Sequence, residues 1–229
     1  TEFHAIIKSI DASVAKKMPG VVGVMTADDI KGTNRIRVIV PDQPVLCEDK
    51  VRAYGDPVAI VAAETREQAR AAAAAVKVTY EKLLVMKTPE EALAPGAVQI
   101  HPHSPNLCFQ QPQIKGDAEK AFKSAAYTVG GDFSTQMNHQ AALEPEACVA
   151  YLDGDELVVI GRSIMIHAHA AIIKEAVGAE KVRYIEPYSG GQFGIKASIS
   201  SEGIAAAAAM YFKRPIRYIP TLAESFLIT

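Results

Sequence analysis

The chain has 229 residues, of which 49% are apolar and 22% are charged, and its formal net charge is −2. This near-neutral charge, without a lysine or arginine cluster, argues against nucleic-acid or membrane-surface binding, and no apolar run approaches the ~20 residues of a membrane span. Cys47, Cys108 and Cys148 are too widely spaced for a disulfide framework or a cysteine-ligated metal site, so we expect reduced, packed thiols. A single catalytic cysteine is the alternative.

The first 82 residues predict an α+β unit. Strands are expected at residues 6–10, 21–25, 57–63 and 76–81. The run at 57–63 is continuously apolar, which predicts a strand buried on both faces. A short helix is expected at 11–18, since an aspartate can cap it and a proline–glycine pair ends it. A capping box at 65–68 predicts a second helix through residue 75.

Residues 83–115 contain five prolines, which indicate a connecting segment. Only Thr88-Pro89-Glu90-Glu91 predicts a helical turn there. His101 and His103, separated by one proline, suggest a metal site, but this coil offers no nearby Asp, Glu or Cys ligand. We therefore expect both imidazoles to face solvent or to bond the backbone.

Residues 116–229 predict a second α+β unit, in which helices pack on a mixed sheet. Helices are expected at residues 118–126, 166–177 and 202–212. Asp117 can cap the first of them, and Gly178 can end the second. The expected strands lie at residues 127–133, 147–152, 156–160, 182–186 and 216–219.

A glycine-rich stretch, Tyr188-Ser189-Gly190-Gly191-Gln192-Phe193-Gly194-Ile195-Lys196, joins a predicted strand to an alanine-rich helix. Backbone without a Cβ can approach a cofactor oxygen closely, and the following helix N-terminus favours negative charge. The spacing matches neither the dinucleotide-binding G-x-G-x-x-G pattern nor a P-loop. It predicts a loop that contacts a cofactor. The alternative is a tight turn in which the glycines only relieve backbone constraints.

Other catalytic templates are mostly missing, because the chain has no G-x-S-x-G elbow and no H-E-x-x-H zinc motif. Glu144, close to His139 in the sequence, is a candidate site carboxylate; alternatively it is a strand-edge residue that pairs with a lysine or water. His167 and His169 are two residues apart, so a helix would place them on different flanks. We expect core or boundary histidines there rather than metal ligands.

Several motifs occur in order along the chain: residues 7–11, 18–26, 49–59, 75–81, 115–117, 139–146 and 190–196. Together they resemble the large molybdenum-binding region of the molybdenum hydroxylases, the xanthine oxidase family, and are most similar to bacterial aldehyde oxidoreductases. The resemblance implies a hammerhead-type α/β domain at 1–82 and a proline-rich connector at 83–115. Residues 116–229 would then form the N-terminal part of a mixed α/β domain that binds molybdopterin.

The resemblance also implies site residues. Gly191, Gln192, Phe193 and Gly194 would contact the cofactor, and the backbone N–H of Phe193 would donate to an apical oxygen on molybdenum without ligating the metal. Arg162 falls where purine-oxidising members carry a glutamine, and Ser163 beside it is a further contact. Ala197 falls where those members carry a substrate-orienting glutamate, which favours an aldehyde over a purine.

The activity implied is oxidation of aldehydes to carboxylic acids, with oxygen taken from water. The implied cofactors are molybdenum–molybdopterin cytosine dinucleotide and two 2Fe-2S clusters, the clusters lying outside this segment. We interpret the chain as a segment of a larger enzyme whose base glutamate follows Thr229, and expect the isolated 229 residues to be inactive. A purine, a nicotinate-like ring or carbon monoxide as the substrate, or a non-catalytic scaffold, are the alternatives.

The partners implied are a small-molecule aldehyde, the rest of the polypeptide or companion subunits, and an external electron acceptor. Nucleic acid and membrane are not expected partners. Family members are often dimers, so the resemblance allows a homodimer. Reduced cysteines favour the cytoplasm, and the periplasm remains an alternative.

Overall fold

The structure, a computed structural model, describes residues 2–36 and 40–228. The chain forms two compact units, one from residues 1–83 with 139–229 and one from residues 84–138. None of the helices that the structure describes has both the length and the apolar character needed to span a bilayer.

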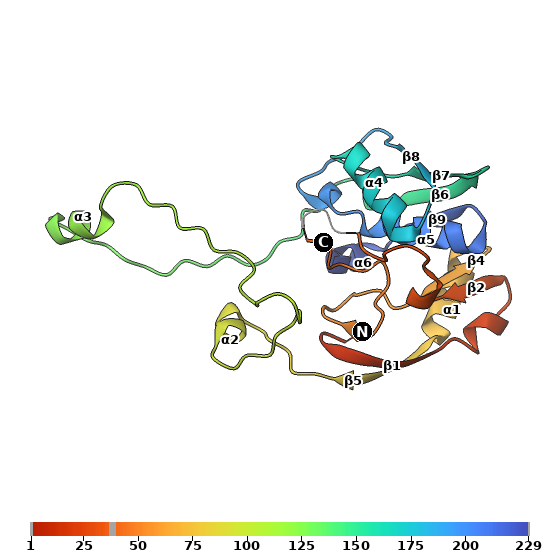
Figure 1. Ribbon diagram of the computed structural model, residues 1–229, viewed down its shortest axis with the longest axis horizontal. Coiled ribbons are helices and arrows are strands. Elements are labelled where there is room, and N and C mark those ends of the chain that lie inside the picture. The colour runs from red at the N-terminus through yellow and green to blue at the C-terminus, as the bar shows by residue number, and fades with distance from the viewer. Residues whose placement is uncertain (1, 37–39, 229) are drawn as a thin grey trace. The chain divides into compact units, whose positions relative to one another are not determined.

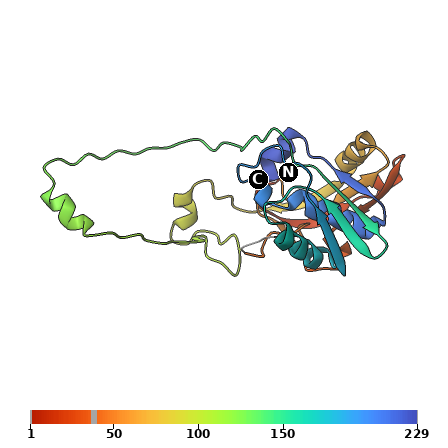
Figure 2. The same ribbon diagram turned by 90° about the horizontal axis from the view of Figure 1, so that it is seen from above.

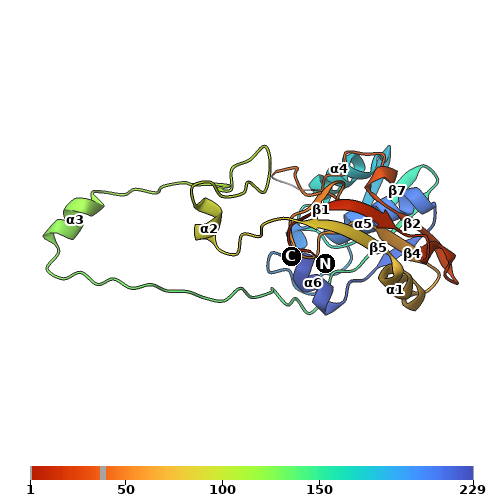
Figure 3. The ribbon, with the colours of Figure 1, turned by 90° about the horizontal axis from the view of Figure 1, so that it is seen from below.

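In the first unit, residues up to 83 form two small antiparallel sheets (Figure 3). Strands β1 (Ala5–Asp11) and β5 (Lys77–Lys82) lie side by side, with β3 (Lys50–Val51) on the other edge of β1. Strands β2 (Val21–Met25) and β4 (Ile60–Ala63) form the second sheet. The predicted capping box begins α1 (Arg66–Ala75), where the Thr65 hydroxyl accepts from Gln68 N at 3.2 Å.

Two predictions for this part are wrong. The expected helix at 11–18 is only a 3₁₀ turn, η1 (Ala15–Lys17), because Asp11 ends β1 and its carboxylate accepts from Ser13 N at 2.9 Å. A second 3₁₀ turn, η2 (Ala27–Asp29), follows β2. The expected strand at 57–63 shortens to β4 and is half-buried, since β4 pairs only with β2 in a two-stranded sheet.

The predicted mixed sheet is confirmed by four strands in the order β8-β7-β6-β9 (Figure 1). The strands are β6 (Cys148–Asp153), β7 (Glu156–Ile160), β8 (Lys181–Ile185) and β9 (Ile216–Tyr218). β7 pairs in parallel with β8, and β6 pairs antiparallel with β7 and β9. Helix α4 (Ile166–Val177) packs on β8 and ends at Gly178, whose φ of 71° is left-handed as a C-terminal glycine allows.

Helix α5 (Ser200–Phe212) forms the centre of the core, because residues 200–209 are all buried. Its alanines have no bulky side chains, so β6, β9 and α4 can approach the helix closely. The same apolar cluster includes Met25, Ile36, Val45 and Leu46 from the N-terminal part of the chain. A helix at the C-terminal end, α6 (Leu222–Ile228), is not among the predicted elements.

The second unit contains only two short helices, α2 (Pro89–Leu93) and α3 (Ala118–Ser124). Asp117 caps α3 as predicted, accepting from Lys120 N at 2.9 Å. The expected strand at 127–133 is wrong: this stretch is extended coil and does not pair with any described strand (Figure 2). Its alternating Tyr127, Val129 and Phe133 side chains are exposed, so the pattern of a strand is present without a neighbour to complete it.

Candidate functional site

The glycine loop, residues 188–196, lies beyond the carboxyl end of β8 and leads through η3 (Ile195–Ala197) into α5. Because β7 runs parallel to β8, its carboxyl end meets the same edge of the sheet. The residues that follow β7 are Gly161, Arg162 and Ser163. The topology therefore brings the two predicted groups of site residues to one edge.

The loop conformation requires glycine at specific positions. Gly191 and Gly194 have φ values of 107° and 96°, in the left-handed region that other residues rarely adopt. Around a Cβ built on Gly194 there is no atom within 4 Å among the described residues, so this backbone faces open space. Phe193, between them, also has a positive φ of 48°, which costs on the order of 1 kcal/mol for a bulky residue, and its ring is exposed. The loop thus presents strained, accessible backbone.

Glu144 contacts this loop through both its backbone and its side chain. Its carboxylate accepts from Gly190 N at 2.9 Å, and its backbone N–H donates to the Gly190 carbonyl at 3.1 Å. The same carboxylate forms an ion pair with Lys196 Nζ, and Lys196 Nζ also donates to Ser189 Oγ at 2.8 Å. Of the two interpretations of Glu144, pairing with a lysine is what the structure shows.

The electrostatics of this pair follow from its burial. Burial raises the pKa of the Glu144 carboxyl, but hydrogen bonds from Lys196 and Gly190 outweigh it and lower the pKa below its usual range. Lys196 is only 1% exposed, so its ammonium group depends on these contacts. The Glu144 carboxylate, with its lowered pKa, thus holds the loop through its bonds to Lys196 and Gly190.

Arg162 lies under the first turn of α5, where it meets Glu202, a residue that no sequence motif singled out. Glu202 Oε1 accepts from the Arg162 backbone N–H at 3.2 Å and lies 3.5 Å from Arg162 Nη2. The Tyr184 hydroxyl donates to the Arg162 carbonyl at 2.8 Å. The only sequence signal for Glu202 is a lone carboxylate at the start of an otherwise apolar helix.

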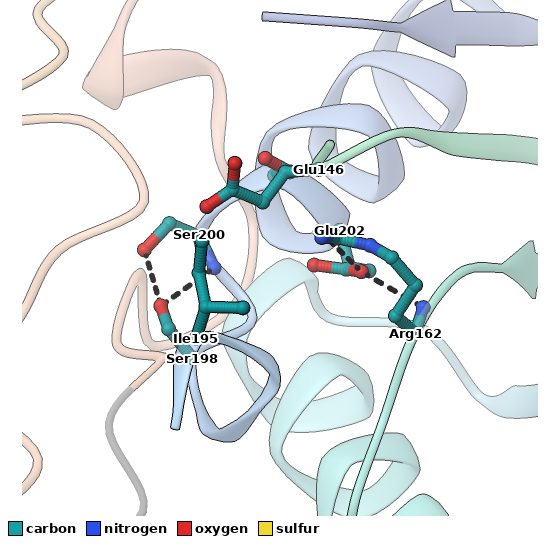
Figure 4. Close-up of a pocket in the computed structure, with 7 residues that line it drawn as sticks. Glu146, Arg162, Ile195, Ser198, Ser200 and Glu202 are labelled. Atoms are coloured by element: carbon teal, nitrogen blue, oxygen red, sulfur yellow. Dashed lines mark hydrogen bonds and ion pairs between the residues drawn. The ribbon is translucent and has the colours of Figure 1, made fainter. Parts of the chain in front are cut away.

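Arg162 and Glu202 border a narrow polar pocket (Figure 4), lined by Glu146, Arg162, Ile195, Ser198, Ser200, Ser201 and Glu202. Burial raises the pKa of Glu202, and the nearby Arg162 only partly opposes this. Four buried atoms of these lining residues have no hydrogen-bond partner among the described residues: Arg162 Nε and Nη1, Ser201 Oγ and Glu202 Oε2. Arg162 therefore keeps donors that are not used inside the described chain.

Ser163 is hydrogen-bonded to a buried histidine of α4. Its hydroxyl lies 2.8 Å from His169 Nδ1 and accepts from Met165 N at 2.9 Å. Which of Ser163 Oγ and His169 Nδ1 donates depends on the tautomer of the histidine. Burial lowers the pKa of His169, although the Ala197 backbone partly opposes this. His169 is therefore a core histidine, as expected, whereas His167 on the same helix is exposed.

The remaining predicted residues are placed as follows. Ala197 is half-buried in η3, directly after the loop, and Gln192 accepts from Gly194 N through its side chain. His139 stacks on Phe226 with ring centroids 4.2 Å apart. Within residues 2–36 and 40–228, no three His, Cys, Asp or Glu side chains gather as metal ligands.

Two family models match the chain. Residues 1–84 match the a/b hammerhead domain of aldehyde oxidase and xanthine dehydrogenase, and residues 100–229 match the molybdopterin cofactor-binding domain. The Megalodesulfovibrio gigas protein "Aldehyde oxidoreductase" is 40% identical over 93% of this chain and 25% of its own length. The "Xanthine dehydrogenase" of Oryza sativa subsp. japonica is 30% identical over 96% of this chain and 16% of its own length.

A solved structure of the aldehyde oxidoreductase from Desulfovibrio gigas superposes on this chain with a TM-score of 0.92 and 38% identity. The match covers 98% of this chain and 26% of that chain. This chain therefore spans about a quarter of the length of these aldehyde oxidoreductases.

Proposed function

Since this chain belongs to the aldehyde oxidase and xanthine dehydrogenase family of molybdenum hydroxylases, we propose that it is part of an aldehyde oxidoreductase. The reaction proposed converts an aldehyde and water into a carboxylic acid, two electrons and two protons. The observation that carries this proposal is the 40% identity to an aldehyde oxidoreductase, together with Ala197 at the end of the glycine loop.

The loop fits a molybdenum–molybdopterin cofactor. The open space beside Gly194 and the exposed Phe193 leave room for a bulky group against bare backbone. When bound, the cofactor supplies a Lewis acid that polarises a carbonyl, activates water and takes up electrons. Gly191, Gln192, Phe193 and Gly194 would hold it, with the Phe193 N–H as a donor to one of its oxygens. We propose the cytosine dinucleotide form of the pterin.

Arg162 and Ser163 would support the same cofactor from the end of β7. Arg162 shares one nitrogen with Glu202, while Nε and Nη1 have no partner among residues 2–36 and 40–228. A fixed guanidinium with spare donors suits an oxygen-rich ligand. Ser163 is oriented by His169 and Met165, so its position is set before any ligand arrives.

We propose that the side chain at position 197 helps to select the substrate. A methyl group there offers no carboxylate to orient the nitrogens of a heteroaromatic ring, whereas an aldehyde needs only a donor to one carbonyl oxygen. A purine is the second candidate, because the chain is also similar to a xanthine dehydrogenase at 30% identity. A nicotinate-like ring and carbon monoxide are further alternatives, and the pocket residues that would decide among these substrates are proposed to lie mostly outside this chain.

The rest of the catalytic apparatus is proposed to lie outside these residues. It would comprise the base glutamate beyond Thr229, two 2Fe-2S clusters and the path to an external electron acceptor. We also propose that the domain division is 1–82, 83–115 and 116–229, that the whole protein is a homodimer, and that it works in the cytoplasm.

The test is to purify the full-length protein that contains this chain. Molybdenum and pterin content would be measured, followed by dye reduction with aldehydes, xanthine, nicotinate and carbon monoxide. We expect about one molybdenum per chain and a kcat/KM for an aldehyde at least about 100-fold above that for xanthine, a difference of about 2.7 kcal/mol. Preference for xanthine would replace the aldehyde proposal, and absence of metal and pterin would indicate a scaffold.

A further inference from the structure

The glycine loop is held by two charged residues that belong to neither predicted group of cofactor contacts. Glu144 comes from the segment that precedes β6, and Lys196 comes from η3. Their ion pair joins these two segments, and both partners also bond the loop itself.

Lys196 is among the largest fully buried side chains in the part of the chain that the structure describes, with 1% exposure. Burying an ammonium group is costly unless it is paired and hydrogen-bonded. Its two partners are the Glu144 carboxylate and the Ser189 hydroxyl, the latter at 2.8 Å. The buried cation therefore draws the start of the loop, at Ser189, toward its end.

Glu144 also holds Gly190 directly. Its backbone N–H donates to the Gly190 carbonyl, and its side-chain carboxylate accepts from the Gly190 N–H. A Cβ on Gly190 would lie 2.7 Å from the Glu144 Cβ, closer than any real side chain allows. Glycine at 190 is thus required by the approach of Glu144, a different reason from the positive φ of Gly191 and Gly194.

Strained backbone lies on both sides of this contact. Phe193 in the loop has a φ of 48°, and Ala141 in the facing segment has a φ of 46°. Left-handed conformations at residues other than glycine persist only where surrounding contacts impose them. The contacts at this point include the Glu144–Lys196 pair and its hydrogen bonds. Two local bonds add to them, from Ala141 N to His139 Nδ1 and from Gly194 N to the Gln192 side chain.

We propose that Glu144 and Lys196 form a latch that positions the backbone of residues 190–194 for the cofactor. Both are positioning residues, since they act through the loop. That the loop faces a cofactor rests on the proposed function. The contacts of the latch do not, because they are made within the protein.

The test uses the full-length protein with Glu144→Gln, Lys196→Met and the double variant. Gln keeps the acceptor for Gly190 N–H but removes the charge. The double variant removes both charges together, which a fold tolerates better than an unpaired buried charge. Matched controls are Glu180→Gln and Lys31→Met, because both of these charged side chains are exposed to solvent.

The first readout is hydrogen exchange of the amides at 189–194, measured on metal-free protein. We expect exchange at least tenfold faster in Glu144→Gln and the double variant, and unchanged in the controls. The second readout is the Mo(V) electron paramagnetic resonance signal of loaded protein, which should shift, with kcat at least tenfold lower and KM within threefold of wild type.

A folded double variant with unchanged exchange and an unchanged spectrum would overturn the latch. The two proposals fail differently. If the purified wild-type protein contains no molybdenum, the proposed function is wrong. The hydrogen-exchange measurement on metal-free protein would still test whether Glu144 and Lys196 hold the loop.

Discussion

Arg162 Nη2 lies 3.5 Å from Glu202 Oε1, and the two side chains are only 3% and 0% exposed. The contact ties the end of β7 to the first turn of α5, and Gly161 beside it leaves room for the carboxylate. Desolvation of such a pair offsets much of its attraction, so its main effect is to make each partner depend on the other.

Removing one partner should therefore cost more than removing both. We expect Glu202→Ala to destabilise the protein by about 3–5 kcal/mol, because it leaves a buried guanidinium without its carboxylate. The double variant Arg162→Met with Glu202→Leu should lose less than about 2 kcal/mol. Urea unfolding of the three proteins measures this. A loss in the double variant as large as that in Glu202→Ala, or larger, would contradict this prediction.

Gly161 should not tolerate a side chain. A Cβ there would lie 2.7 Å from Glu202 Cγ and 2.9 Å from the Tyr184 hydroxyl. We expect Gly161→Ala to lower the free energy of unfolding by about 1–3 kcal/mol, because neither neighbour can move without breaking its bond to Arg162. Gly130→Ala is the control, since no atom of the described residues lies within 4 Å of that Cβ. Similar losses in both variants would contradict the packing argument.

His169 should make stability fall in mild acid. Burial lowers its folded-state pKa below the usual 6.5, so between these two values the unfolded chain binds more protons than the folded one. Stability contributed by the neutral imidazole is therefore complete above about pH 6.5 and is lost as the pH falls toward the folded-state pKa. Unfolding free energy measured from pH 5 to 8 should show this slope.

The pH slope should depend on His169 alone among the histidines of α4. His169→Gln should flatten the slope between pH 5 and 6.5, while His167→Gln should leave it unchanged because that side chain is exposed. An identical slope in wild type and His169→Gln would show that other groups cause it.

Ala197 should control substrate choice in the full-length enzyme. Ala197→Glu places a carboxylate directly after the glycine loop, where it would repel electron-rich oxygens and could accept from a ring N–H. We expect kcat/KM for aldehydes to fall by about tenfold or more, with the ratio of purine to aldehyde activity rising. Ala197→Ser adds a polar group without a carboxylate; it is the uncharged control and should change the ratio by less than about threefold. A ratio unaltered by the glutamate would place substrate recognition elsewhere.

Elements predicted from local signals were mostly found where the sequence placed them. The capping box at Thr65 and the terminating Gly178 depend on contacts within a few residues, so their chemistry is visible in the sequence. The predictions that were wrong concern segments whose conformation depends on other parts of the chain. The apolar alternation at 127–133 predicted a strand, but a strand requires a neighbouring edge, which the described residues do not provide. The helix expected at 11–18 is only a 3₁₀ turn at Ala15–Lys17, because β1 continues to Asp11.

The family resemblance, the mixed sheet and the position of the glycine loop could be predicted from the sequence, because periodicity, turn residues and motif order are visible along the chain. Three contacts became visible only in the folded chain: Lys196 is buried against Glu144, Glu202 meets Arg162, and His169 orients Ser163. These contacts join residues from different elements, and burial of a charge depends on what packs around it. No local pattern encodes that environment.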